Sequence, residues 1–221
     1  MDTPTFLGQP RTQQRILIPA HGTRFRPIWD PVAFGGTRGS KIYGLGITSS
    51  DASANTIVLA IGKALTLGSN VGTGAFVDGG GGSDSITRTS GSFVTDGWNI
   101  GDPLQLLGAS TLANDFKALL TSVAAGTIAM ATGTVQAAEN LLATTKLYRI
   151  AQLGIIDVPA NSGYITANAS VNGLNVTEMP WINAKPDDFL TLGADDVLMA
   201  AAGTALGTGE TIDITAFGAD Y

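Results

Sequence analysis

Cysteine is absent from this chain of 221 residues, and histidine occurs only once, as His21. Without cysteine the chain can form no disulfide and no thiolate metal site, and a zinc site made of several histidines is excluded as well. A Ser-His-Asp triad would have to use His21, which lies in a segment rich in Pro, Gly and Arg with no nucleophile motif nearby. These absences predict a protein that is not an enzyme and has no cofactor.

Charged side chains are also scarce, at 14% of the residues, against about 25% in an average soluble domain. Their distribution is uneven, because residues 1–41 have a net charge of +4 and the remainder of the chain has −10. A basic segment on an acidic body favours docking onto an acidic neighbour, including another copy of the chain, although a solvated surface segment explains it equally well. No nucleic-acid partner is expected, since the acidic body would repel phosphate.

Long apolar runs are missing too. No run reaches the roughly 18 apolar residues that a membrane helix needs, and the first residues do not have the pattern of a secretory signal peptide. We therefore expect a protein that is made in the cytoplasm and has no membrane partner.

Short β-type segments and turn formers are what the chain does contain. It has 29 glycines and is 44% hydrophobic, and turn signals recur every 8–12 residues, as in sandwiches and barrels. This pattern predicts an all-β fold, a β-sandwich or β-barrel with an extended N-terminal arm. The arm is expected over residues 1–41 and the β-rich body over 42–221, with a division of the body near the Gly-rich stretch 68–85 left open.

Within the body, residues 42–48 and 56–67 are predicted to form a strand pair, because both are rich in β-branched residues and a polar turn separates them. Residues 116–123 fit a strand or a helix. Residues 136–143 are the one stretch that predicts a short helix, since Glu139, Leu141 and Leu142 have good helix propensity.

The basic N-terminal segment provides the candidate interface residues. Its arginines would pair with acidic surfaces and its aromatic side chains would serve as apolar anchors. The candidates are Arg11, Arg15, Arg24, Phe25, Arg26, Trp29 and Phe34. The acidic pairs Asp187-Asp188 and Asp195-Asp196 are interpreted as solvated turns rather than a calcium site, because the alternating acidic loop of calcium sites is missing. No metal ligand is therefore assigned.

Two segments resemble a pattern of tailed-bacteriophage virion proteins, in which a phrase like G-F-x-x-D-G-[FW]-x-x-G-D precedes a hairpin. Here they are Ser90–Asp102, which reads SGSFVTDGWNIGD, and Leu119–Ile128. In such a pattern glycines permit tight corners, aromatic residues plug a small barrel and aspartates cap turns. Pro103 departs from it, and its missing N–H predicts an edge strand.

The rest of the chain is similar in style to phage capsid-decoration (cement) proteins, with an extended arm, Gly/Ala/Thr-rich strands and few charges. The resemblance implies a virion structural protein that stabilises the phage head by non-covalent contacts. It would assemble with itself, as a trimer in the simplest case, and with the major capsid protein or other virion proteins. A tail-tube or head-tail connector component is the first alternative, and a carbohydrate- or receptor-binding β-module is the second.

Overall fold

The computed structural model describes residues 10–31, 39–65, 70–110, 114–163, 168–174 and 190–220. It is an all-β structure with three antiparallel sheets, which confirms the predicted fold class. A short 3-10 helix, η1, spans Pro19–His21. Among the described residues, no helix is long and apolar enough to span a membrane.

The chain divides into two compact units. The first unit comprises Met1–Ile61 and Gln152–Tyr221, and the second comprises Gly62–Ala151. The second unit is thus inserted into the first, and the chain passes between them within two long strands, β4 (Asn55–Leu65) and β12 (Lys146–Val158). The division falls inside strands and not in the Gly-rich stretch 68–85, whose described part belongs to the second unit.

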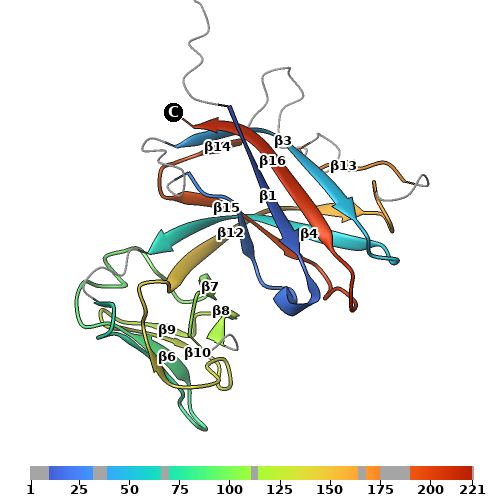
Figure 1. The fold of residues 1–221 in the computed structure, drawn as a ribbon. Helices are drawn as coiled ribbons and strands as arrows, with labels where there is room; N and C mark the ends of the chain where they lie inside the picture. The colour runs from blue at the N-terminus through green and yellow to red at the C-terminus, as the bar shows by residue number, and fades with distance from the viewer. Residues whose placement is uncertain are drawn as a thin grey trace, which may run out of the picture. The chain divides into compact units, whose positions relative to one another are not determined.

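The first unit is a β-sandwich. In one sheet, β1 (Pro10–Leu17), β16 (Ile212–Asp220) and β3 (Ser40–Ser49) lie side by side (Figure 1). The far edge of β3 pairs with β13 (Val171–Asn172) and β14 (Leu190–Leu192). The other sheet has the order β2-β15-β4-β12, where β2 is Arg26–Trp29 and β15 is Asp196–Ala202.

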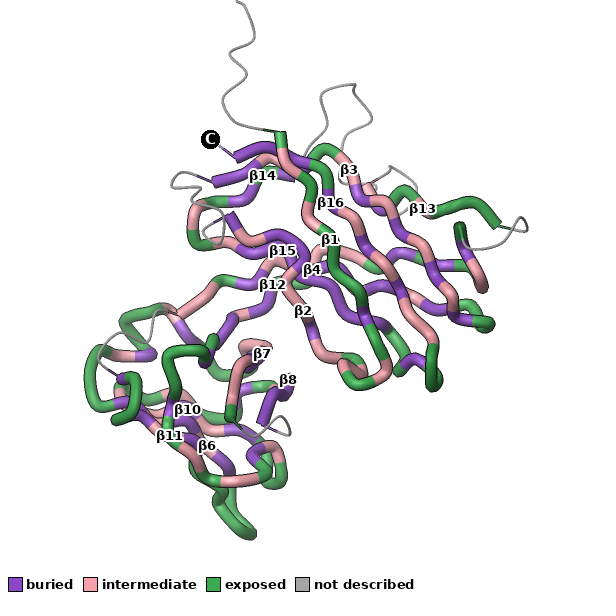
Figure 2. The backbone as a smooth tube through the Cα atoms, in the orientation of Figure 1, coloured by how far each residue is buried: buried purple, intermediate pink, exposed green. Residues whose placement is uncertain are grey.

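An aliphatic core fills the space between the two sheets of the first unit. It includes Ile47 and Ile214 from one sheet and Leu59 and Leu198 from the other, all with no exposed surface. Along β16 buried and partly exposed residues alternate from Ile212 to Phe217 (Figure 2). This period of two is what a strand with one face on a core requires.

The first unit corrects the predicted strand pair. Residues 42–48 and 56–67 do supply strands, β3 and β4, but they pair with different sheets, β3 with β16 and β4 with β15 and β12. The turn between them is therefore a crossover and not a hairpin. Crossing places the apolar residues of both strands opposite one another in the core, where a hairpin would have kept them in one sheet.

Shorter strands build the second unit. One sheet has the order β11-β5-β6-β10-β9, and next to β12 lie β7 and then β8. The bounds are β5 (Ala75–Val77), β6 (Asp84–Thr87), β7 (Pro103–Leu107), β8 (Lys117–Leu119), β9 (Ser122–Val123), β10 (Thr127–Met130) and β11 (Glu139–Asn140). A core separate from that of the first unit is enriched in aromatic residues, among them Phe76, Phe93, Trp98 and Phe116.

Two local predictions for the second unit are wrong. Residues 136–143 are not helical, because Glu139 pairs with Phe76 of β5, its carboxylate accepts a hydrogen bond from Asn114 Nδ2 at 2.8 Å, and Leu141 is buried. These tertiary contacts override helix propensity. Pro103 does not mark an edge strand, since β7 lies between β12 and β8. The register of β12 on β7 ends at Leu104, so the proline meets only β8 and no β12 pairing needs its missing N–H.

Candidate functional site

Three arginines gather around His21 in the first unit, and we call Arg15, Arg24 and Arg26 the arginine cluster. Arg15 lies near the end of β1, Arg24 follows η1, and Arg26 begins β2. The Nε of Arg15 donates to the carbonyl oxygen of Pro27 at 2.9 Å, and the Nε of Arg24 donates to the carbonyl oxygen of His21 at 2.9 Å. Because backbone oxygens hold two of the guanidinium groups, part of the positive charge has a fixed position.

The pKa of His21 is lowered by burial and by the nearby positive charges. Burial lowers its pKa from 6.5 to about 4, with further contributions from the charges of Arg26, Arg15 and Arg24. The neutral imidazole accepts a hydrogen bond at Nδ1 from the backbone N–H of Ile18 at 3.2 Å. At neutral pH the charge of this region therefore comes from the arginines, while His21 acts as an uncharged part of the turn.

The other predicted interface residues have different surroundings. Arg11 forms an ion pair with Asp220 of β16, with Nη1 2.8 Å from Oδ2. Phe25 and Trp29 are only 3% and 0% exposed, and Trp29 belongs to the core of the first unit. Phe34 lies outside the described residues. The structure thus brings together Arg15, Arg24 and Arg26 and leaves the two aromatic residues buried beneath the surface.

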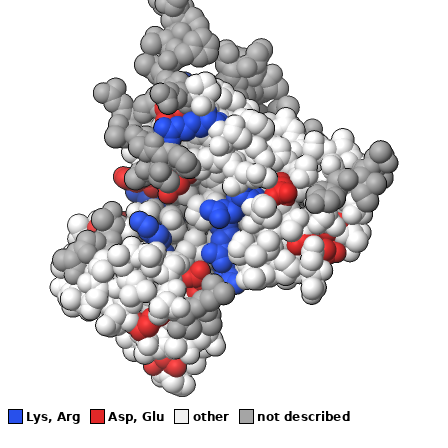
Figure 3. All heavy atoms as spheres, in the orientation of Figure 1, with Lys and Arg blue, Asp and Glu red and all other residues white. Residues whose placement is uncertain are grey.

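Charge is sparse on the visible surface. Figure 3 shows Lys and Arg gathered in a few places on a face that is mostly uncharged. Where the structure describes the chain, no group of three or more His, Asp or Glu side chains could hold a metal ion. Of the acidic pairs, Asp196 caps a turn by accepting the backbone N–H of Gly193 at 2.9 Å, and Asp187 and Asp188 lie outside the described residues.

The two segments that carry the phage resemblance meet in the second unit. The N–H of Phe93 donates to the carbonyl oxygen of Ala125 at 2.9 Å, and Gly101 donates to Leu120 at 2.8 Å. Gly97 and Gly101 have φ values of 81° and 87°, a region that glycine adopts without steric cost. The glycines therefore do form the tight corners that the pattern predicts.

The aromatic residues of the pattern form the centre of this unit. Phe93 and Trp98 pack edge to face with ring centroids 6.4 Å apart. The guanidinium carbon of Arg88 lies 4.2 Å from the centroid of the Phe93 ring, and Arg88 Nη1 pairs with Asp96 Oδ2 at 2.6 Å. Asp102 caps a turn by accepting the N–H of Asn99 at 2.9 Å. The residues of the pattern thus form the core and the turns of this small β unit.

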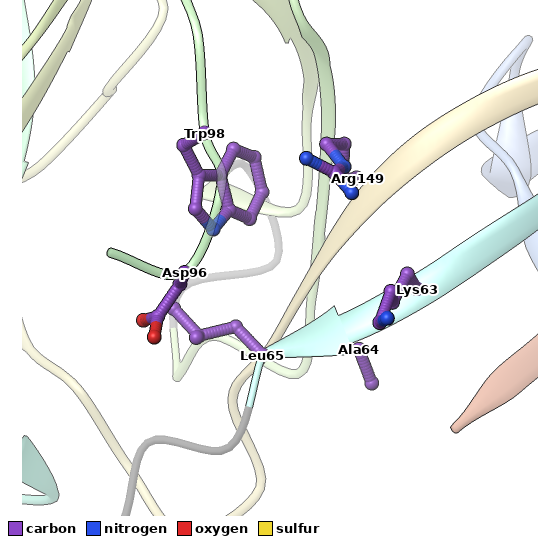
Figure 4. Close-up of a pocket in the computed structure, with 6 residues that line it drawn as sticks. All are labelled: Lys63, Ala64, Leu65, Asp96, Trp98 and Arg149. Carbon is purple, nitrogen blue, oxygen red and sulfur yellow. The ribbon is translucent and has the colours of Figure 1, made fainter. Parts of the chain in front are cut away.

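A pocket of about 270 Å³ opens beside this aromatic centre (Figure 4). Its walls come from the end of β4, from the turn that contains Asp96, and from β12. The lining residues are Lys63, Ala64, Leu65, Asp96, Trp98 and Arg149. Arg149 Nη1 donates to the carbonyl oxygen of Gly97, and the Oδ2 of Asp102 lies 3.9 Å away from it.

The pattern over Ser90–Asp102 predicted tight corners at its glycines, but sequence reasoning did not find this pocket. Lys63 and Arg149 are far apart in the sequence, and each is a single cation on a strand, so no local spacing connects them. Only the closure of the second unit by β4 and β12 brings both to the turn at residues 96–98.

Comparison of the chain with protein-family models, with curated proteins and with solved structures finds no match.

Proposed function

We propose that this chain is a structural protein of a tailed-phage virion, a capsid decoration protein that stabilises the head by non-covalent contacts. The observation that carries the proposal is the arginine cluster, which presents fixed positive charge on a chain with a net charge of −6. Charge complementarity of this kind selects a partner and its orientation. The partner would be an acidic surface of the major capsid protein or of a second copy of the chain.

The sparse surface charge and the phage-like pattern support the same proposal. A surface with few charges is suited to packing in an assembly. The segments Ser90–Asp102 and Leu119–Ile128 form one hydrogen-bonded structure, which agrees with a pattern that builds a domain and not a catalytic loop. The mechanism is passive, because contacts across subunit joints resist the pressure of packaged DNA without any chemical step.

Binding to undecorated heads of the parent virion tests the proposal. The double variant Arg15→Gln/Arg24→Gln removes two charges of the cluster, and Lys117→Gln/Lys146→Gln removes two charges from the second unit as a matched control. We expect the arginine variant to bind about tenfold more weakly at low salt, a change of about 1.4 kcal/mol, and the control to bind like the wild-type chain. Equal binding by the two variants would rule out docking through the cluster.

The mass of the chain in solution separates this proposal from the first alternative. A compact oligomer, a trimer in the simplest case, that attaches to heads supports the decoration role. Rings that stack into tubes would assign the chain to the tail, as a tail-tube or connector component. A monomer that attaches to no virion part would contradict both.

A further inference from the structure

We propose that the pocket of the second unit binds an acidic sugar, that is, a monosaccharide that carries a carboxylate. The pocket is lined by Lys63, Ala64, Leu65, Asp96, Trp98 and Arg149. None of these residues belongs to the arginine cluster, so this inference stands or falls independently of the decoration role.

The charge of the pocket favours an anion. Arg149 uses Nη1 for the carbonyl oxygen of Gly97, and its other guanidinium nitrogens make no hydrogen bond within the described residues. Lys63 is exposed and, within the same residues, has no ion pair or hydrogen bond. The one lining carboxylate, Asp96, is already compensated by Arg88, whose side chain is only 3% exposed. Arg149 also forms a long ion pair with Asp102 at 3.9 Å. Three cations, Lys63, Arg88 and Arg149, therefore face two carboxylates, and one net positive charge remains for a ligand.

Arg149 is suited to a carboxylate in particular. The Gly97 carbonyl positions its planar guanidinium at the edge of the turn, and the Asp102 carboxylate at 3.9 Å is too distant for a close bidentate pair. A guanidinium fork with remaining N–H donors matches the two oxygens of a carboxylate. The ammonium of Lys63 adds a second charge from β4 (Figure 4).

The rest of the lining favours a sugar over a simple anion. Trp98 is only 4% exposed and reaches the pocket with part of its indole, whose Nε1 lies on the side of Asp96 and Leu65 (Figure 4). The edge-to-face contact with Phe93 fixes the orientation of the ring. The second carboxylate oxygen of Asp96 can accept a hydrogen bond from a hydroxyl, and Ala64 and Leu65 can contact carbon atoms. An inorganic anion could accept from the indole N–H but would use neither the Asp96 oxygen nor the apolar contacts of Ala64 and Leu65.

The size of the pocket sets the size of the ligand. Its volume of about 270 Å³ is below the roughly 300–1,000 Å³ of pockets that hold drug-sized molecules. One sugar ring is therefore expected to fit, either as a free monosaccharide or as the end of a longer glycan.

Titration of the full-length ¹⁵N-labelled chain, followed by ¹H–¹⁵N NMR, tests this assignment. D-glucuronate is the probe, D-glucose is the neutral control that differs only at C6, and acetate is the control for the carboxylate alone, all at equal ionic strength. We expect glucuronate to shift the Trp98 indole N–H and the amides of residues 96–98, with at least tenfold weaker responses to glucose and acetate.

Variants then localise the binding. Lys63→Gln and Arg149→Gln are each expected to weaken glucuronate binding at least threefold, and Lys146→Gln, an exposed lysine of the same unit outside the pocket, is expected to leave it unchanged. Equal responses to glucose and glucuronate overturn the role of the carboxylate. A response to acetate as strong as to glucuronate overturns the sugar, and no response to any probe overturns the site.

Discussion

The two units of this chain are stabilised by different kinds of contact. Long paired strands organise the first unit, where β1 and β16 are in register from Pro10↔Ala219 to Leu17↔Ile212. Among the described residues, its core cluster has one aromatic residue, Trp29, in 19 members, whereas that of the second unit has four in 13. Aliphatic side chains at alternating positions suffice where strands are long, and the second unit, with strands of two to five residues outside β4 and β12, relies on large aromatic side chains instead.

Buried polar side chains show the same contrast. Within the described residues the first unit buries three charged or amide side chains and the second buries six. In the second unit, such side chains accept hydrogen bonds from backbone N–H groups of loops that have no neighbouring strand. The Oδ1 of Asn70 accepts the N–H groups of Thr89 and Ser90 at 2.8 and 2.9 Å, and Asn114 Oδ1 accepts the N–H of Gln136 at 2.8 Å. In the second unit, buried polar side chains thus hold loops in place, whereas in the first unit neighbouring strands hold each other.

The largest expected effect comes from the aromatic centre of the second unit. Phe93→Ala removes a fully buried ring that contacts Trp98 and Arg88, and should lower the free energy of unfolding of this unit by about 3–5 kcal/mol. Hydrogen exchange then shows which of the two units has lost stability. Amides of β6 and β10 should exchange faster, and those of β3 and β16 should keep their protection. Equal loss of protection in β3 and β16 would show that the two units unfold as one.

Asp84 is a buried, charged hydrogen-bond acceptor in the second unit. Its carboxylate is fully buried and accepts the N–H groups of Gly79 at 2.9 Å and Val135 at 2.8 Å. Burial alone would raise the pKa of Asp84, but these backbone donors, with Thr134 and Gly133, hold it below its usual value of 3.8. Asp84→Asn should lower the free energy of unfolding at pH 7 by about 2–3 kcal/mol, because a charged acceptor is lost.

The pH dependence of the Asp84 effect follows from the direction of its pKa shift. A carboxyl group whose pKa is lower in the folded state stabilises the fold above its unfolded pKa and loses this contribution as the pH falls through the folded pKa. The difference between the wild-type chain and Asp84→Asn should therefore shrink below pH 3.8. Denaturant titrations at neutral and acid pH measure it, and a difference that grows on acidification would contradict the assignment.

A matched pair of glycine substitutions sharpens the comparison. Gly108, in a loop of the second unit, has a φ of 78°, and a Cβ there would collide with the Thr144 carbonyl oxygen. Gly108→Ala should thus destabilise the chain by about 1–3 kcal/mol. At Gly44, on β3, a Cβ would meet only the Phe217 ring at 3.9 Å. Gly44→Ala should stabilise the chain by about 0.4–1 kcal/mol. In thermal melts, Gly108→Ala should therefore lower the melting temperature and Gly44→Ala should raise it. A shift in the same direction for both variants would contradict the prediction.

At neutral pH the smallest effect is expected at His21 in the first unit, because its imidazole is mostly uncharged in both the folded and the unfolded state. A base whose pKa falls from 6.5 to about 4 on folding binds fewer protons in the folded state, so the free energy of unfolding should decrease as the pH drops from 6.5 towards 4. His21→Gln should remove this part of the slope. Urea titrations across that range measure it, and an unchanged slope in the variant would assign the acid sensitivity to other groups.

The all-β class and the long strands were predictable because they depend on local pattern. The strands at 146–158 and in 211–217 agree with their β-branched residues, and the turn at Asp96-Gly97 agrees with a glycine that tolerates positive φ. Pairing was not predictable in the same way. Nothing in residues 42–48 says that the next strand joins the opposite sheet, since either choice buries the same side chains.

The candidate sites also differ in whether local sequence or tertiary structure reveals them. Arg15, Arg24 and Arg26 are visible in the sequence as a basic segment, and the structure brings them together around His21. That Trp29 is buried follows only from the sandwich, because an aromatic residue next to prolines and arginines fits a core and an interface equally well. Lys63 and Arg149 became neighbours of one pocket through tertiary structure alone.

The register of β1 on β16 has a mechanical consequence. Pro10 and Ala219 are directly opposite one another, so a pull on these two residues would open the ladder one residue pair after another, as a zipper opens. Each hydrogen-bonded pair would carry the whole load alone, and the strands would part at low force. Under the proposed decoration role, tension would therefore have to enter the chain through its sheet faces and its arginine cluster, and not through β1 and β16 pulled apart at Pro10 and Ala219.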